Sequence, residues 1–151
     1  MTINLYTPKT KEEIQKIENL LLSLHGTQIK DVWKVGLCLG LRIDELLPIE
    51  FKDINNDTLQ LKIYKTRNNN TSIIHITPRV KEIILSIRNR HPMDEFVFQS
   101  HNKLDIKNKV SKPISKQAIH EAFKNVGEIL NMKISPNSMR HTAVKNAFKY
   151  I

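Results

Sequence analysis

The spacing of apolar residues changes along the chain, and this change constrains the fold more than any other feature of the sequence. Near the start, Ile14, Ile17 and Leu21 follow the spacing of an amphipathic helix. In the middle, residues 58–65 alternate apolar and polar side chains, which places Leu59 and Leu61 on one face of a strand. Helical spacing then returns. We therefore predict an α+β fold, mainly α-helical, with one small antiparallel β-sheet built on a hairpin at about residues 58–77.

Start and stop signals give the boundaries of the predicted elements. Thr10 with Glu13 makes a capping box, and Gly26 suits a helix end. Pro78 suits the first turn of a later helix. The polar, basic residues 100–113 are predicted to form an exposed loop. Helices are predicted at residues 8–26, 29–39, 42–48, 78–91, 115–130 and 134–151, within a single domain that spans residues 1–151.

The charge balance indicates the kind of partner. The chain has 24 Lys and Arg residues against 15 Asp and Glu, for a net charge of +9. This excess favours an anionic partner, most often nucleic acid, although a lysine-rich surface that only aids solubility is the alternative. Cys38 is the single cysteine, which excludes an internal disulfide, and its apolar neighbours predict a small buried thiol. Because no signal peptide or membrane-length apolar run is present, we expect a soluble, cytoplasmic protein with no membrane partner.

An arginine interrupts one of the most apolar runs of the chain, CLGLRIDELL at residues 38–47. The neighbours Leu41, Ile43 and Leu46 are predicted to enter the core. An arginine carried on a buried helix costs free energy unless its guanidinium finds a partner. The partner of Arg42 is either an internal carboxylate or a group on a bound molecule.

Three stretches of the chain, taken in order, resemble the motifs of the tyrosine recombinases, also called phage integrases. GLRIDELLPIEFKDI (40–54) resembles the first arginine box of this family, in which a glutamate follows the arginine by three residues. LQLKIYKTRNNNTSIIHIT (59–77) resembles the β-hairpin that carries an active-site lysine, and SPNSMRHTAVKNAF (135–148) resembles the second arginine box. Each motif is only moderately specific alone. All three in order, across nearly the whole chain, indicate the recombinase catalytic-domain fold.

The resemblance implies a reaction on double-stranded DNA, in which a tyrosine attacks a phosphodiester and becomes linked to the 3′ phosphate. Arg42 and Arg140 match the two arginines that clamp the non-bridging oxygens of the transition state. Lys65 is the best match to the hairpin lysine that protonates the leaving 5′ oxygen, ahead of Lys62 and Arg67. Neither a metal ligand nor a cofactor is expected, because the arginines supply the positive charge.

Other residues are given supporting or DNA-binding roles by the same resemblance. Glu45 is expected to orient or neutralise Arg42, and His141 is expected to support the second arginine. Taken singly, such residues have ordinary alternatives: a surface ion pair, a solvated strand end or, for His141, a hydrogen-bonded packing residue, which we favour. Because all three motifs occur together and in order, we favour the recombinase fold over these ordinary alternatives. Contacts to the DNA backbone are expected from Arg67, Lys103, Lys107, Lys109 and Lys112.

Two departures from the family pattern stand out. Asn137 occupies the position where the family has a histidine three residues before the second arginine. An asparagine donates a hydrogen bond to phosphate but carries no proton at neutral pH, and a role as helix N-cap after Pro136 is an equal alternative. Tyr150 follows Arg140 by ten residues, or about 15 Å along one continuous helix, so we interpret it as a packing residue. We therefore expect a truncated catalytic domain that lacks the nucleophile and does not cleave DNA by itself.

Three functions stay open at this stage. The first is site-specific recombination or integration by the complete protein, acting as a tetramer on DNA. The second is a non-catalytic DNA-binding relic, which a stop codon directly after Ile151 in the parent reading frame would support. The third is a helical protein-interaction domain, for which random duplex DNA would show no salt-sensitive binding.

Overall fold

The computed structural model describes residues 10–61 and 72–145, and the chain divides into two compact units. One unit combines the two ends of the sequence, Met1–Ile43 and Lys116–Ile151, whereas the other is the continuous segment Asp44–Ser115. The second unit is therefore inserted into the sequence of the first. A single domain over residues 1–151 stays a prediction.

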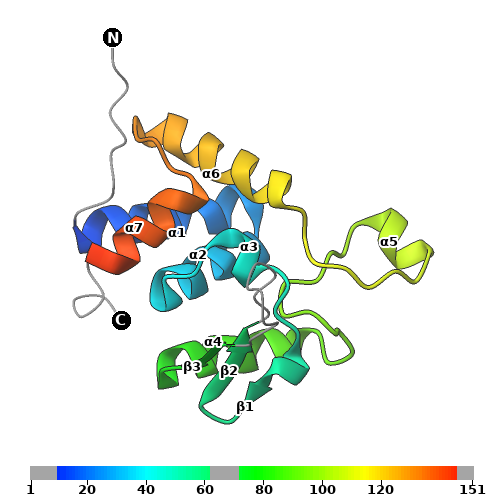
Figure 1. Cartoon of the computed structure of the whole chain (residues 1–151). Helices are drawn as coiled ribbons and strands as arrows, with labels where there is room; N and C mark the ends of the chain where they lie inside the picture. Colours follow the sequence, from blue (N-terminus) through cyan, green and yellow to red (C-terminus); the bar gives the residue numbers. More distant parts are fainter. Residues whose placement is uncertain (1–9, 62–71, 146–151) are drawn as a thin grey trace, which may run out of the picture. The chain divides into compact units, whose positions relative to one another are not determined.

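In its described part, the first unit is helical (Figure 1), with α1 (Lys11–His25), α2 (Thr27–Leu39), α6 (Lys116–Leu130) and α7 (Pro136–Lys145). The predicted capping box is present: the Glu13 N–H donates to Thr10 Oγ1 at 3.1 Å, and the Thr10 N–H donates to Glu13 Oε1 at 3.1 Å. Gly26 ends α1 with φ of 93°, a backbone conformation that L residues with a side chain rarely adopt. Helix α1 packs against α2 and α6, and α2 packs against α7.

The core of this unit joins residues from both ends of the sequence. Trp33 of α2 meets Phe123 of α6 edge to face, with ring centroids 5.5 Å apart and planes at 90°. Both rings are fully buried, and such aromatic pairs add stability beyond their buried area. Further buried side chains come from all four helices of this unit: Ile17, Leu21, Val32, Val35, Ile119, Val126 and Met139.

The described part of the second unit contains a three-stranded antiparallel sheet in the order β1-β2-β3. Its strands are β1 (Ile54–Asn55), β2 (Thr58–Leu61) and β3 (Ser72–His75). Leu59 pairs with Ile54 on one side and Ile74 on the other, and both Leu59 and Leu61 are buried. The predicted hairpin and its buried face are therefore confirmed for the described strands.

The sheet is preceded by short turns and followed by α4 (Pro78–Arg90). Thr77 caps α4 by accepting the Val80 N–H at 3.3 Å, and Pro78 occupies its first turn as predicted. Lys81 Nζ lies 3.0 Å from Asp57 Oδ1, which ties α4 to the turn between β1 and β2. The predicted helix at 42–48 is shorter in the structure: α3 covers Ile43–Leu46, followed by a 3-10 turn at Phe51–Asp53.

The prediction of an exposed loop at residues 100–113 was wrong in two respects. The segment contains α5 (Lys103–Lys107), and Asp105 within it is buried with 5% relative exposure. The Ser100 hydroxyl donates to Asp105 Oδ2 at 2.6 Å, Lys112 Nζ lies 3.3 Å from Oδ1, and Asn102 caps the helix. A carboxylate with these partners organises a segment that shows no apolar periodicity. None of the helices in the described ranges is both long and apolar enough to cross a membrane.

Candidate functional site

Arg42 lies just beyond the end of α2 and is exposed. Gly40 ends the helix in the left-handed conformation, with φ of 65° and ψ of 25°, and its N–H donates to the Gly36 carbonyl at 2.8 Å. Leu41 and Ile43 on either side of Arg42 are buried. The neighbours of Arg42 therefore enter the core, as predicted, while the arginine itself is exposed and lies between helices rather than on one.

Arg140 lies on α7, whose start is fixed by two serines. The Ser138 N–H donates to Ser135 Oγ and the Ser135 N–H donates to Ser138 Oγ, both at 3.3 Å. Ser138 also donates its hydroxyl to the Lys133 carbonyl at 3.1 Å. These bonds satisfy donors that a helix start otherwise leaves unpaired, and they fix the beginning of the helix that carries Arg140.

The Nε atom of the Arg140 guanidinium has unusual surroundings. Arg140 is half-exposed, yet its Nε is buried and finds no hydrogen-bond acceptor in the structure of the described residues. A buried N–H without an acceptor costs roughly 1–3 kcal/mol. Such a donor fits a ligand site but is not specific to one, because Trp33 Nε1 in the core also lacks an acceptor among the described residues.

The two arginines belong to the same unit: Arg140 lies on α7, and Arg42 follows α2, the helix against which α7 packs. Helix α7 packs on α2, and the buried Met139 side chain lies directly over Gly36. Met139 precedes Arg140 in the sequence, and Gly36 lies one turn before the end of α2, which leads to Arg42. The fold thus brings together the two helices associated with the two arginine boxes, although these boxes lie at opposite ends of the sequence.

The structure excludes one of the two equal alternatives for Asn137 and the favoured interpretation of His141. Helix α7 begins at Pro136, with Ser135 before it accepting the Ser138 N–H, so Asn137 lies inside the helix and is not its N-cap. Its side chain is exposed. His141 is exposed as well, which contradicts its interpretation as a packing residue.

The remaining predicted residues lie in the second unit or outside the described residues. Glu45 is half-buried on α3, in the second unit. Lys65 and Arg67 lie outside the described residues, as does Lys62, although the strands on both sides of the hairpin turn are described. Cys38 is half-buried, so the small buried thiol that we predicted is only partly realised.

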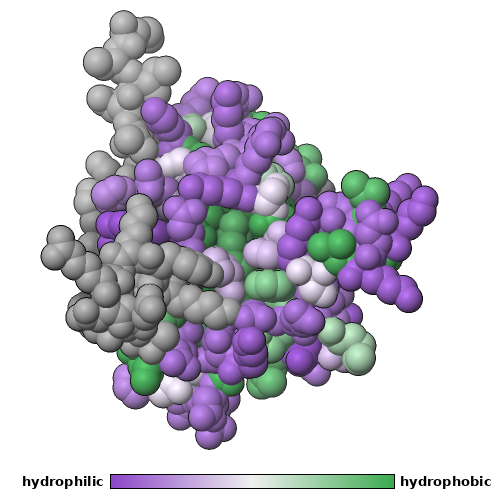
Figure 2. All heavy atoms as spheres, turned by 45° about the vertical axis from the view of Figure 1, so that its right-hand side comes forward, coloured by the Kyte–Doolittle hydropathy of each residue, from purple (hydrophilic) through white to green (hydrophobic). Residues whose placement is uncertain are grey.

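The four predicted lysines of the α5 segment are all exposed. Apolar side chains lie exposed beside them: Leu104 at 66%, Ile106 at 62% and Val110 at 45% relative exposure. Figure 2 shows such apolar groups at the surface among hydrophilic side chains. Lys112 is paired with Asp105, which leaves Lys103, Lys107 and Lys109 as the more available cations for an anionic partner.

Comparison with known proteins agrees with the fold. The curated tyrosine recombinase XerA of Saccharolobus solfataricus is 24% identical over 134 residues, which cover 89% of this chain and 41% of XerA. The chain therefore spans less than half the length of this relative. The lambda integrase catalytic core superposes with a TM-score of 0.72 at 15% identity, covering 97% of this chain and 85% of that one. The crystal structure of XerA recombinase gives a TM-score of 0.69 at 14% identity, covering 95% and 50% of the two chains.

The sequence also matches the model of the phage integrase family over residues 9–148, almost the entire chain. This match includes both arginine boxes and the hairpin between them. The chain belongs to the phage integrase family.

Proposed function

We propose that this chain forms the phosphate-binding part of a tyrosine recombinase that cuts and rejoins double-stranded DNA. The observation that carries the proposal is the Arg140 guanidinium, whose buried Nε finds no acceptor among residues 10–61 and 72–145, on a helix packed against the helix that leads to the exposed Arg42. Two planar guanidinium forks that stay charged at any working pH suit an anion with several equivalent oxygens. A DNA phosphodiester is such an anion.

In the proposed mechanism, Arg42 and Arg140 bind the non-bridging oxygens of the scissile phosphate. These contacts strengthen as the attacking tyrosine turns the phosphate into a phosphorane with more negative charge, so they stabilise the transition state more than the ground state. Lys65 donates the proton to the 5′ oxygen that leaves, and Asn137 adds a hydrogen bond to the phosphate. The phosphotyrosine retains the energy of the broken bond, so that the strand can be rejoined.

The solved relatives support duplex DNA and self-association as the working context. Lambda integrase has been solved as a dimer bound to a core site and as a tetramer bound to a Holliday junction. We propose that the complete protein likewise assembles as a tetramer on DNA. The nucleophile is not assigned to Tyr6, Tyr64 or Tyr150, all of which lie outside the described residues.

The first test replaces each arginine with alanine in the complete protein and measures cleavage of a suicide DNA substrate. Losing one preorganised donor to a developing oxyanion typically costs about 10²–10³-fold in rate. We expect Arg42→Ala and Arg140→Ala each to lose cleavage by at least that factor while most DNA affinity remains. Arg79→Ala, an exposed arginine in the first turn of α4, serves as the matched control and should cleave normally. Near wild-type cleavage in either active-site variant would contradict the assignment.

The second test addresses the basic segment around α5. Each lysine that contacts a phosphate contributes about 0.9 to the slope of log affinity against log salt. Replacing Lys103, Lys107 and Lys109 together with alanine should therefore lower that slope by up to about 2.7. Lys11, Lys16 and Lys124, exposed on α1 and α6, make a matched triple control. An equal loss in both triple variants would mean that only net charge matters.

A non-catalytic DNA-binding relic is the alternative, and Asn137 favours it. This exposed side chain stands in the first turn of α7 where the family pattern has a histidine, and it cannot transfer a proton at neutral pH. A relic binds duplex DNA with salt sensitivity but forms no covalent protein–DNA product. Trapping a denaturation-resistant protein–DNA adduct with the complete protein would exclude this alternative.

A further inference from the structure

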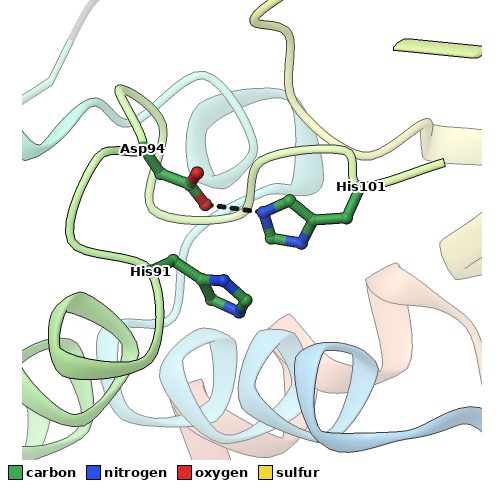
Figure 3. A group of neighbouring side chains, drawn as sticks. All are labelled: His91, Asp94 and His101. Carbon is green, nitrogen blue, oxygen red and sulfur yellow. Dashed lines mark hydrogen bonds and ion pairs between the residues drawn. The ribbon is translucent and has the colours of Figure 1, made fainter. Parts of the chain in front are cut away.

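Three potential metal ligands meet in the second unit, in the segment between α4 and α5 (Figure 3). His91 follows the last turn of α4, Asp94 lies in the next turn, and His101 precedes α5. One potential ligand atom from each residue lies within 4.8 Å of those of the other two. His101 Nε2 is 2.7 Å from Asp94 Oδ2, and the two imidazole rings lie 4.2 Å apart between centroids with planes at 31°.

The backbone that carries these side chains is held from outside the cluster. An Arg88 Nη donates to the Asp94 carbonyl at 2.7 Å and to the His91 carbonyl at 3.4 Å. The same guanidinium lies over the Phe51 ring, 4.0 Å from its centroid. The two carbonyls belong to two of the three potential ligand residues, so Arg88 fixes their spacing without using their side chains. Preorganised backbone of this kind lowers the entropy cost of binding a ligand.

The carboxylate of Asp94 is held as well. Gln99 Nε2 donates to Asp94 Oδ1 at 3.1 Å, while Gln99 Oε1 accepts the Glu95 N–H at 2.9 Å. Hydrogen-bonded carboxylates and histidines are the usual surroundings of metal ligands in proteins. The side chains of Asp94 and His101 keep 14% and 30% relative exposure, so an ion can reach them from solvent.

Two imidazoles and one carboxylate form a donor set that Zn²⁺ accepts, with water in the fourth position. Zinc bonds of about 2.0–2.1 Å in a tetrahedron place ligand atoms about 3.3 Å apart. The ligand atoms of the three residues now lie within 4.8 Å of one another. Side-chain rotations that shorten their separations by up to about 1.5 Å would therefore bring them to the spacing of a tetrahedral zinc site.

We propose that His91, Asp94 and His101 form a binding site for a divalent zinc-class cation that clamps the segment between α4 and α5. On binding, the ion replaces the hydrogen bond between His101 and Asp94 and separates the two stacked rings. The site lies in the second unit and uses none of the residues assigned to the phosphate. Its existence is therefore independent of the proposed recombinase function.

The test uses the full 151-residue chain without a histidine tag, freed of metal with a chelator. Zinc chloride is titrated by calorimetry, and cobalt chloride is titrated by visible absorption, which reports the ligand types. We expect one equivalent to bind, with no thiolate charge-transfer band from Cys38. His91→Ala and His101→Ala should each weaken binding by at least about tenfold. His75→Ala and His120→Ala, exposed histidines of β3 and α6, should leave it unchanged.

A second measurement on the unaltered chain covers the case in which a variant fails to fold. Diethyl pyrocarbonate acylates accessible neutral imidazoles, and mass spectrometry locates the modified histidines. Zinc should protect His91 and His101 but leave His75 and His120 reactive. Equal protection of all four, a cobalt–thiolate band, or undiminished binding by the His91/His101 double variant would each overturn the proposal.

Discussion

The contact between Gly36 and Met139 provides the sharpest test of how the two arginine boxes come together. A Cβ built on Gly36 would collide with the Met139 Sδ and Cε atoms, and the Met139 side chain is fully buried. Gly36→Ala therefore forces the thioether out of its place between α2 and α7. The collision is with a flexible side-chain end and not with backbone, so the unit should still fold.

The expected free energies follow from two opposing effects. Replacing glycine by alanine inside a helix stabilises it by about 0.5–1 kcal/mol, whereas overpacking a core costs about 1–3 kcal/mol. Gly36→Ala should therefore lower the free energy of unfolding by up to about 2.5 kcal/mol. Met139→Ala alone leaves a cavity and should cost about 2–5 kcal/mol. In the double variant the new methyl group enters space that the methionine has left, so the two losses should not add.

Urea unfolding followed by circular dichroism measures all members of this double-mutant cycle. We expect the double variant to be more stable than the sum of the single losses predicts, by about 1–3 kcal/mol. Thr10→Ala combined with Met139→Ala is the control pair, because Thr10 is exposed at the start of α1 and should add to Met139 within about 0.5 kcal/mol. Additivity of Gly36→Ala with Met139→Ala within that margin would refute the packing argument.

Two further predictions concern stability. Hydrogen bonding from Ser100, followed by Lys112 and Asn102, lowers the pKa of Asp105 against the opposing effect of burial. The stability that the ionised Asp105 side chain provides is present above the usual aspartate pKa of about 3.9, and it is lost as pH falls through the lower folded-state pKa. Urea midpoints should therefore fall below about pH 4 in the wild type, and Asp105→Asn should be less stable at pH 7 with a smaller acid loss; an unchanged acid loss would contradict the assignment. Thr10→Ala removes the cap of α1 and should cost about 1 kcal/mol in the same assay, whereas Thr10→Ser should retain most of it.

The elements that sequence patterns predicted well are those with local causes. The capping box at Thr10, the glycine stop at Gly26 and the proline start at Pro78 each act within a few residues, and the structure contains all three. The alternation of Leu59 and Leu61 likewise predicts one buried strand face, because neighbouring side chains on a strand point to opposite sides. In these cases the spacing of nearby residues was sufficient to predict the structural element.

The α5 segment could not be predicted in the same way. Its helix is a single short turn with Leu104 and Ile106 exposed, so no apolar stripe marks it. It is organised by a buried carboxylate whose partners, Ser100 and Lys112, lie on both sides of it. An aspartate in a basic segment is indistinguishable from a solvated one until the chain folds around it. The proximity of His91, Asp94 and His101 could not be predicted either, because their spacing in the sequence matches no familiar metal motif.

For the candidate phosphate site, part of the description came from sequence motifs and part only from the folded structure. Motif order named Arg42 and Arg140 as candidates, and the apolar run predicted the buried neighbours of Arg42 that the structure contains. Of the two equal alternatives for Asn137, the structure excludes the helix N-cap, because the serine pair before Arg140 supplies the cap and leaves the Asn137 side chain exposed.

The buried Nε of Arg140 has a consequence for the chemistry that the site can perform. Among the described residues, this N–H is excluded from water and lacks an acceptor, which costs free energy. A lysine at this position would carry the same charge without that donor, and the planar guanidinium also keeps its charge in surroundings that would neutralise an ammonium. Arginine is thus the residue that remains cationic at the edge of the core, beside the packed Met139. Under the proposed function, such a cation at the α2–α7 contact would be a fixed positive partner for the transition state, and fixed partners stabilise developing charge without first having to reorganise.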